Sequence, residues 1–248
     1  MTSLTSKSST HGIQTPLISV ENVSYRFPDG KLTIRNVTFS VNAGERIALV
    51  GPPGSGKTTL LYLLKGILIP TIGFIRFENQ PLEDKWKQRA QMMTGLVFQN
   101  PDDQLFPSTV YKNVAMELVR ANTPKAEINR RVENALRVVG LEHSAQRNPI
   151  DLSGGDKRRV CIAAVLAKNP ILLLLDDPSS GLDAAMRLEL LNLIKEKNQT
   201  RVTATTDLEL AQNLADRVIL IDDGEVIADA PANTVLRDKR LLAKHGIS

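Results

Sequence analysis

Residues 51–58 read Gly-Pro-Pro-Gly-Ser-Gly-Lys-Thr and match the pattern G-x-x-x-x-G-K-[ST]. In such a stretch the glycines let backbone N–H groups converge on phosphate oxygens, an approach that a β-carbon would obstruct. The short apolar run Arg46–Val50 precedes the pattern, and a helical stretch from Lys57 to about Leu68 follows it. A strand before the loop and a helix after it are what phosphate binding requires. Because glycine makes up about 7% of ordinary proteins, a chance match in a chain of this length has a probability of about 1%. We therefore interpret residues 51–58 as a phosphate-binding loop.

The loop predicts specific contacts with a nucleotide. Lys57 is expected to reach the outer phosphates, and the Thr58 hydroxyl is expected to bind Mg²⁺. The helix that begins at Lys57 adds the positive end of its dipole. The candidate nucleotide-binding residues of the loop are Gly51, Pro52, Pro53, Gly54, Ser55, Gly56, Lys57, Thr58 and Thr59.

Two stretches further along the chain fit the same chemistry. Ile171–Asp176 is an aliphatic strand that ends in a carboxylate, so Asp176 is a candidate Mg²⁺ ligand, directly or through water. Ser153-Gly154-Gly155 stands at the start of a predicted helix and presents a hydroxyl, bare amides and a helix dipole to an anion. Each stretch alone is weak evidence, because serine N-caps and acidic loops after strands are common. Their order, with Ser-Gly-Gly just before the strand that ends in Asp176, favours the functional interpretation.

Strands and helices alternate along most of the chain, which predicts an α/β fold with a doubly wound parallel sheet. A leading pair of strands, Leu17–Phe27 and Thr33–Val41, and a helical stretch at about 110–155 are expected to form two appended subdomains. Thr123 is expected to cap a helix that Pro124 opens. The helix that Pro124 opens is expected to run to about Val139. The other expected helices are Val110–Arg120, Ser153–Lys168, Ala184–Lys197 and Leu208–Ala215. The other expected strands are Phe74–Phe77, Gly95–Phe98, Arg201–Thr206, Arg217–Ile221 and Glu225–Ala228.

The composition of the 248 residues excludes several classes of protein. A net charge of +4 without a long basic run, together with 4% aromatic residues, argues against nucleic-acid binding. The single cysteine, Cys161, excludes a disulfide framework and a multi-cysteine metal site. Apolar runs such as Ile171–Leu175 fall far short of the roughly 20 residues of a membrane span, so any membrane role is expected to require a partner. The Ser/Thr-rich residues 1–16 are expected to be a disordered tail without the features of a secretory signal.

With these motifs in this order, residues 17–248 resemble the ATP-binding cassette (ABC) ATPases. The resemblance implies an ABC-type P-loop NTPase fold: a RecA-like parallel sheet core, an N-terminal antiparallel β-subdomain and an inserted α-helical subdomain at about residues 107–158. It implies ATP and Mg²⁺ as ligands. It also implies that two such domains pair head to tail, with Ser153-Gly154-Gly155 of each contacting ATP held in the phosphate loop of the other.

The resemblance assigns roles to three more residues. Gln99 matches the glutamine that senses Mg²⁺ and the attacking water and relays to the membrane subunits, so it is a candidate catalytic residue and metal ligand. Asp183, in Ser180-Gly181-Leu182-Asp183, matches the loop that follows the catalytic carboxylates. Phe27 falls at the position expected to stack on adenine. Tyr25, two residues earlier on the same strand face, is the competing candidate, and core packing is its expected role.

A narrower resemblance follows Gln99. The run Gln99-Asn100-Pro101-Asp102-Asp103-Gln104-Leu105-Phe106 is similar to the ATPases of energy-coupling factor transporters, and Lys157-Arg158-Arg159-Val160 fits the same group. These ATPases power the import of vitamins and of transition-metal ions such as cobalt or nickel. The resemblance therefore implies integral membrane transport subunits and a second ABC ATPase as partners, and a peripheral position at the cytoplasmic face of the membrane. The chain ends at Ser248 without a longer C-terminal extension, so dimerisation is expected to depend on ATP and membrane partners.

Three positions depart from the family pattern. The residue after Asp176, usually the glutamate that acts as base for the attacking water, is Asp177, whose side chain is shorter by one methylene. A displacement of about 1 Å can cost roughly 100-fold in rate. The switch position, usually histidine, is Thr206, which can donate one hydrogen bond but carries no charge. The usual glutamine after Ser-Gly-Gly is Asp156, which a helix N-terminus tolerates.

Three hypotheses stay open on this basis. The first is an energising ATPase of an importer that works with membrane subunits, in which Asp177, Gln99 and Thr206 are the catalytic residues and Asp177 is a slower base than glutamate. The second is a nucleotide-binding, regulatory subunit that hydrolyses ATP poorly and lends its Ser-Gly-Gly to a competent partner ATPase. The third is an ABC protein that acts without a transporter. A single cassette without a long coiled-coil insertion, and the run after Gln99, count against the third.

Overall fold

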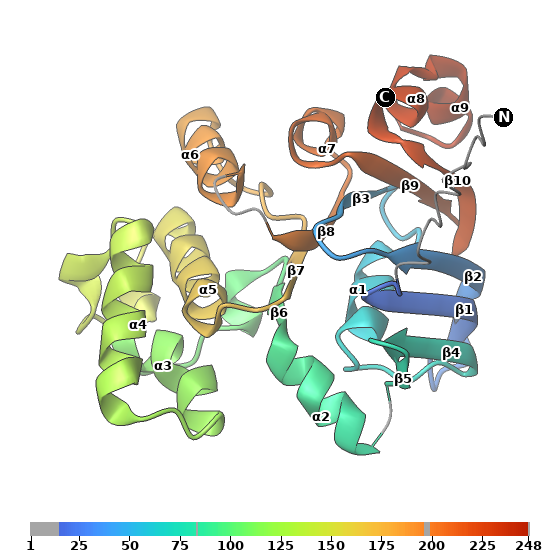
Figure 1. Cartoon of the computed structure of the whole chain (residues 1–248). Coiled ribbons are helices and arrows are strands. Elements are labelled where there is room, and N and C mark those ends of the chain that lie inside the picture. The colour runs from blue at the N-terminus through green and yellow to red at the C-terminus, as the bar shows by residue number, and fades with distance from the viewer. Residues whose placement is uncertain (1–14, 83, 196–198, 248) are drawn as a thin grey trace, which may run out of the picture.

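The computed structural model describes residues 15–82, 84–195 and 199–247 and contains two β-sheets with helices around them (Figure 1). Residues 1–14 of the predicted tail lie outside the described residues. The smaller sheet is antiparallel and has the strand order β2-β1-β4-β5. Its strands are β1 (Ile18–Arg26), β2 (Leu32–Val41), β4 (Ile72–Phe77) and β5 (Gln80–Pro81). The predicted leading strand pair is thus part of this antiparallel sheet.

The larger sheet has the strand order β10-β9-β3-β8-β7-β6. Its members are β3 (Arg46–Val50), β6 (Thr94–Val97), β7 (Leu172–Asp176), β8 (Thr200–Thr205), β9 (Arg217–Asp222) and β10 (Glu225–Pro231). All neighbours pair in parallel except the hairpin of β9 and β10. Every residue of β6, β7 and β8 is buried, as expected for strands covered on both faces. The mixed α/β fold expected from the sequence is confirmed, and the carboxyl ends of β3, β6, β7 and β8 lie at one edge of this sheet.

Helix α1 (Lys57–Leu64) lies between the two sheets, where Leu60, Leu61, Leu63 and Leu64 share one apolar core with both. A second core joins α3 (Val110–Arg120), α4 (Lys125–Val138) and α5 (Gly154–Lys168) to the other face of the parallel sheet. The remaining helical segments are η1 (Pro101–Asp103), η2 (Glu142–Ser144), η3 (Pro149–Asp151), α6 (Ala184–Lys195), α7 (Leu208–Leu214), α8 (Ala232–Arg237) and α9 (Lys239–Lys244). Within the described residues, no helix is long and apolar enough to cross a membrane.

The structure corrects several expected boundaries. Helix α1 ends at Leu64 rather than about Leu68, because Gly66 adopts a left-handed φ of 70°, the usual backbone of a helix end. The expected Thr123 cap is wrong. Pro124 has an extended ψ of 140°, so it occupies the N-cap position without a side-chain hydrogen bond and α4 begins at Lys125. Helix α2 (Asp84–Met93) occupies a stretch that the sequence left unassigned, and α8 and α9 were not expected either.

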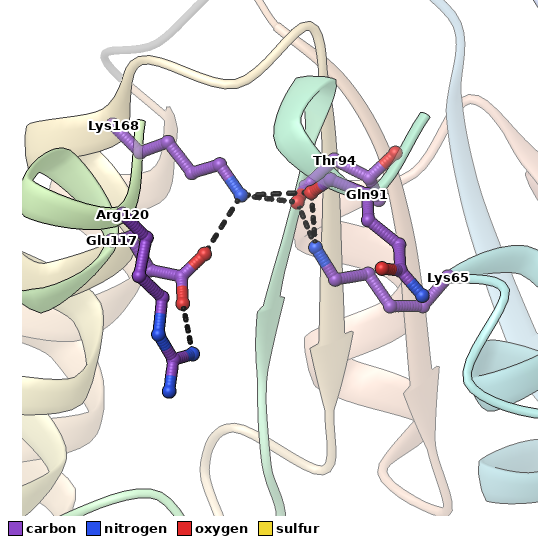
Figure 2. A network of polar contacts seen from close by, with 6 residues as sticks. All are labelled: Lys65, Gln91, Thr94, Glu117, Arg120 and Lys168. Carbon is purple, nitrogen blue, oxygen red and sulfur yellow. Dashed lines mark hydrogen bonds and ion pairs between the residues drawn. The ribbon is translucent and has the colours of Figure 1, made fainter. Parts of the chain in front are cut away.

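Two lysines hold the end of α2 against the rest of the molecule (Figure 2). The Lys65 ammonium donates to the carbonyl oxygens of Gln91, at 2.6 Å, and Thr94. The Lys168 ammonium donates to the same Gln91 oxygen at 2.8 Å and to the Glu117 carboxylate at 3.2 Å. Lysine side chains at a helix C-terminus satisfy carbonyl groups that have no partner within the helix. The cluster therefore ties α1 and α5 to the end of α2.

Candidate functional site

The carboxyl ends of four parallel strands place the predicted site at one edge of the larger sheet. β3 leads into the loop 51–58, β6 into Gln99, β7 ends at Asp176, and β8 is followed by Thr206. Crevices at this edge of an open α/β sheet are where such folds bind ligands. A cavity of about 680 Å³ lies elsewhere, beside the Lys65–Lys168 cluster, and no residue of the loop 51–58 lines it. We place the site by its chemistry, at the open surface around the loop.

Two positions in the phosphate-binding loop admit only glycine. A β-carbon on Gly51 would lie 2.0 Å from the carbonyl oxygen of Ile221. Gly56 has a φ of 105°, and a β-carbon there would lie 2.9 Å from the carbonyl oxygen of Thr33. Side chains at these positions would force the neighbouring backbone to move. The close approach of β9 and β2 to the loop therefore fixes its path, as well as leaving its N–H groups accessible.

Lys57, the first residue of α1, folds back over its own loop. Its ammonium donates to the carbonyl oxygens of Gly51 and Pro52, both at 2.8 Å, and to the Ser55 hydroxyl at 3.2 Å. Burial lowers the pKa of Lys57, while Asp177 and Asp176 act in the opposite direction. The loop thus holds a partly buried cation beside its glycines.

Asp176 has the features of a cation ligand. It is 2% exposed, and its Oδ1 accepts a hydrogen bond from the Thr58 hydroxyl at 3.1 Å. Its Oδ2 is buried and has no hydrogen-bond partner among the described residues. Burial raises the pKa of Asp176, and Thr58 acts against that rise. A buried carboxylate oxygen without a partner costs free energy that a bound cation would offset.

The oxygen donors of Thr58 and Asp176 fit Mg²⁺, a hard cation that is usually held by one or two protein ligands together with substrate phosphates and water. The described part of the chain contains no group of three or more His, Cys, Asp or Glu side chains that could hold a metal ion by itself. This donor set therefore suits a magnesium ion that arrives with a phosphate ligand.

Asp177 is held in place by a neighbouring strand. Its φ of 40° lies in the left-handed region, which aspartate tolerates better than most residues, and its N–H donates to the carbonyl oxygen of Ala204 at 2.8 Å. The Thr205 hydroxyl donates to Asp177 Oδ1 at 3.2 Å and accepts from the N–H of Asp207 at 3.0 Å. Thr205 is fully buried, whereas Thr206 is exposed. The sequence directed attention to Thr206 and missed Thr205, because only the fold shows which threonine faces the carboxylates.

The other predicted residues lie on separate segments. Gln99 is exposed just after β6, and the Asp183 carboxylate caps α6 by accepting from the N–H of Met186 at 2.8 Å. Phe27 is half-buried and packs edge-on against Tyr25, with ring centroids 4.9 Å apart. Tyr25 is itself 9% exposed within the core, in agreement with its expected role.

Ser153 begins α5 and pairs with Asp156. Its hydroxyl accepts from the N–H of Asp156 at 3.1 Å and donates to the Asp156 carboxylate at 2.9 Å. Ser153 and Gly154 are exposed. No hydrogen bond or ion pair between described residues joins Ser153-Gly154-Gly155 to the loop 51–58. Asp156 thus strengthens the helix cap, and the Ser-Gly-Gly surface is open to another molecule.

Comparison with known proteins places these features in a family context. The chain matches the ABC transporter family over residues 34–180. The energy-coupling factor transporter ATP-binding protein EcfA of Methanocaldococcus jannaschii is 36% identical over 233 residues, which cover 92% of this chain and 84% of that protein. The structure of CbiO1 from Clostridium perfringens, part of the ABC transporter complex cbiONQ, is similar with a TM-score of 0.80 at 35% identity, covering 93% of this chain and 94% of that chain. The dimeric ATP-binding cassette MJ0796, solved in a post-hydrolysis state with ADP and Pi, has a TM-score of 0.79 at 30% identity, covering 87% of this chain and 98% of that one.

Proposed function

The chain belongs to the ABC transporter ATP-binding proteins, and from that premise we propose that it is the MgATP-hydrolysing subunit of an importer of the energy-coupling factor type. The observation that carries the proposal is that a glycine-rich loop and Asp176, whose buried Oδ2 has no partner among the described residues, meet at one edge of the sheet. The similarity to EcfA and to CbiO1 supports uptake of a vitamin or a transition-metal ion, with integral membrane subunits as partners and a peripheral position at the cytoplasmic face of the membrane.

In the proposed mechanism the residues of the loop hold the phosphates of ATP. The backbone N–H groups of the non-proline residues of the loop bind the phosphate oxygens together with the Lys57 ammonium, which leaves the carbonyl oxygens of Gly51 and Pro52, and Phe27 stacks on the adenine. Thr58 and Asp176, with Gln99, would hold Mg²⁺, which neutralises developing negative charge during phosphoryl transfer. Asp177 orients and deprotonates the attacking water, with Thr206 at the switch position.

The second half of the site comes from another ATPase. Ser153, Gly154 and Asp183 lie on surface segments that we propose contact the ATP of a second ABC ATPase, either an identical chain or a related one. Support comes from the exposure of Ser153 and Gly154 and from the dimeric state of MJ0796.

One observation favours the alternative of a weakened, regulatory subunit. Asp177 is shorter than glutamate and one of its oxygens is engaged by Thr205, while the switch position holds an uncharged Thr206. In this alternative the chain binds MgATP at its own site, hydrolyses it slowly and supplies Ser153-Gly154-Gly155 to a competent partner.

Steady-state ATP hydrolysis by the purified chain, alone and with a second ATPase, decides between the two. Vigorous turnover by the chain alone that Asp177→Asn abolishes supports the first function and excludes the weakened site. Tight MgATP binding with negligible turnover, restored when a second ATPase is added, supports the alternative. Lys57→Ala is the control for both, since it removes the phosphate-binding cation, and unchanged nucleotide affinity in that variant would contradict the assignment of the loop.

A further inference from the structure

Three consecutive cations follow the Ser-Gly-Gly stretch, and each contacts a different part of the molecule. The Lys157 ammonium pairs with Asp102 of η1 at 2.7 Å. The Arg159 guanidinium pairs with Glu189 of α6. Asp102 follows Gln99 in the sequence, and α6 follows Asp183, so the two ion pairs connect α5 to two different segments that adjoin predicted site residues. Arg158, between them in the sequence, contacts both the Gln99 segment and the segment before Asp183.

Arg158 is 5% exposed and bridges two backbone segments. Its Nη1 donates to the carbonyl oxygen of Phe98 at 3.0 Å, and its Nη2 donates to that of Ser180 at 3.2 Å. Phe98 directly precedes Gln99, and Ser180 lies midway between Asp177 and Asp183. The guanidinium group is planar and rigid, so the two carbonyl groups are held in a fixed relation to each other and to α5.

The charge of Arg158 is not explained by packing alone. Among the described residues, no carboxylate lies within 4.0 Å of its guanidinium, and its Nε has no hydrogen-bond partner. A buried cation without a contacting carboxylate is costly, and a cation near a helix N-terminus is opposed by the helix dipole. Burial lowers the pKa of Arg158, while Cys161, Asp177 and Asp176 act in the opposite direction. The Arg158 guanidinium therefore contacts the segments that contain Phe98 and Ser180 and lies near the carboxylates of Asp176 and Asp177.

We propose that Arg158 is a positioning residue that couples the Gln99 loop to the Asp177–Asp183 loop and to the start of α5, so that a change in one segment is transmitted to the other two. The inference rests on the proposed function for the identity of the signal, which is nucleotide at the loop 51–58. The bridge itself is a property of the chain without nucleotide. Lys157 and Arg159 each stabilise one side only, which makes them matched controls.

Hydrogen–deuterium exchange of the full-length chain tests the coupling. Arg158→Gln keeps a polar side chain but cannot reach both carbonyls, and it is compared with Lys157→Gln and Arg159→Gln. We expect Arg158→Gln to accelerate exchange by about tenfold or more in both residues 98–105 and residues 177–184, because local opening sets amide exchange. Lys157→Gln is expected to affect residues 98–105 only, and Arg159→Gln is expected to affect α6 around its partner Glu189 without loosening residues 98–105. Exchange in β1 and β2 should be unchanged in all three variants.

A second arm adds MgATP. In the wild type, MgATP is expected to slow exchange in the Gln99 loop (residues 98–105) and in residues 177–184. In Arg158→Gln, MgATP is expected to slow exchange in the loop 51–58 and in the Gln99 loop, but no longer in residues 177–184. Wild-type exchange in both loops of Arg158→Gln, or loosening of only one, would overturn the coupling. If Arg158→Gln fails to fold, Arg158→Lys, which keeps the charge without the forked geometry, is expected to loosen both loops partially. No response of the wild-type chain to MgATP would contradict the proposed function, while the nucleotide-free comparison still decides the role of Arg158.

Discussion

At the scale of single residues, the hydroxyl of Thr205 connects the N-terminus of α7 to the candidate base. It accepts a hydrogen bond from the N–H of Asp207 and donates one to Asp177 Oδ1. A catalytic carboxylate whose orientation is set by a buried hydroxyl has less freedom to move out of line with the attacking water. If Asp177 is the base of the proposed function, Thr205 is therefore a positioning residue for it.

Replacing Thr205 by valine tests this arrangement. Valine has nearly the same shape but no hydroxyl, so Thr205→Val leaves the Asp207 N–H without its partner and Asp177 free to rotate. We expect turnover of ATP to fall about 10- to 100-fold with little change in KM. The free energy of unfolding is expected to decrease by about 1–3 kcal/mol.

Thr205→Ser is the matched control, because it keeps the hydroxyl and removes a methyl group. Its turnover is expected to stay close to that of the wild type. Full turnover in Thr205→Val, measured in the same assay and with the same partner chain, would contradict a role for Thr205 in orienting Asp177.

At the scale of elements, the end of α2 depends on an unusual pair of lysines. Burial, and next the charge of Lys168, lower the pKa of Lys65 to about 7 from an ordinary value of 10.5. Between these two values the unfolded chain binds a proton at Lys65 that the folded chain has released. The stability of the fold therefore rises with pH across that range, and the cost of burying the charge is fully present below about pH 7.

Urea unfolding at a series of pH values measures this effect. We expect the titration of Lys65 to raise the free energy of unfolding by at most about 1.4 kcal/mol per pH unit above pH 7. Lys65→Arg keeps a cation and its donors but does not release a proton in this range, and Lys65→Met removes the titrating group. Both variants are expected to lose the rise in stability relative to the wild type between about pH 7 and about pH 9. A difference from the wild type that stays constant with pH would contradict the lowered pKa.

At the scale of the whole molecule, the candidate site is divided between two surfaces. In the proposed function, loop 51–58 holds the nucleotide of its own chain, while Ser153 and Gly154 are exposed and no hydrogen bond between described residues joins Ser153-Gly154-Gly155 to that loop. A β-carbon on Gly51 would meet backbone at 2.0 Å, whereas one on Gly154 would have nothing within 4 Å in the single chain. A substitution of Gly51 therefore probes nucleotide binding within one chain, and a substitution of Gly154 probes contact with a second chain.

The pair Gly51→Ala and Gly154→Ala tests the division. Gly51→Ala is expected to weaken MgATP binding by the monomer by about 100-fold or more and to lower the melting temperature, because β9 must shift. Gly154→Ala is expected to keep both properties of the wild type but to prevent the nucleotide-dependent dimer, since its methyl group occupies the surface that meets the partner. Isothermal calorimetry and sedimentation with MgATP measure the two effects. Normal nucleotide-dependent dimerisation of Gly154→Ala would contradict an ATP contact through this surface.

Elements with a strong local signal were predictable from the sequence. The strand β7, which is aliphatic up to its final Asp176, and the alternating strands β1 and β2 are found close to their expected bounds, because burial on two faces or on one leaves a distinct apolar pattern. Helix α2 lacked such a signal, since most of its described side chains are not buried and Ala90 is its one fully buried apolar residue among them. The six-residue helices α8 and α9 are too short for periodicity to identify.

By itself the sequence determined where a phosphate-binding loop is expected, since residues 51–58 are a contiguous stretch whose glycines, lysine and threonine depend on local geometry. Only the tertiary structure decided which distant residues contact one another around the candidate site. Thr58 meets Asp176 across 118 positions, Arg158 meets Phe98 across 60, and Thr205 rather than Thr206 meets Asp177. Such contacts depend on how distant strands and helices pack, and on which face of a strand each side chain lies, and neither is encoded in any short window of residues.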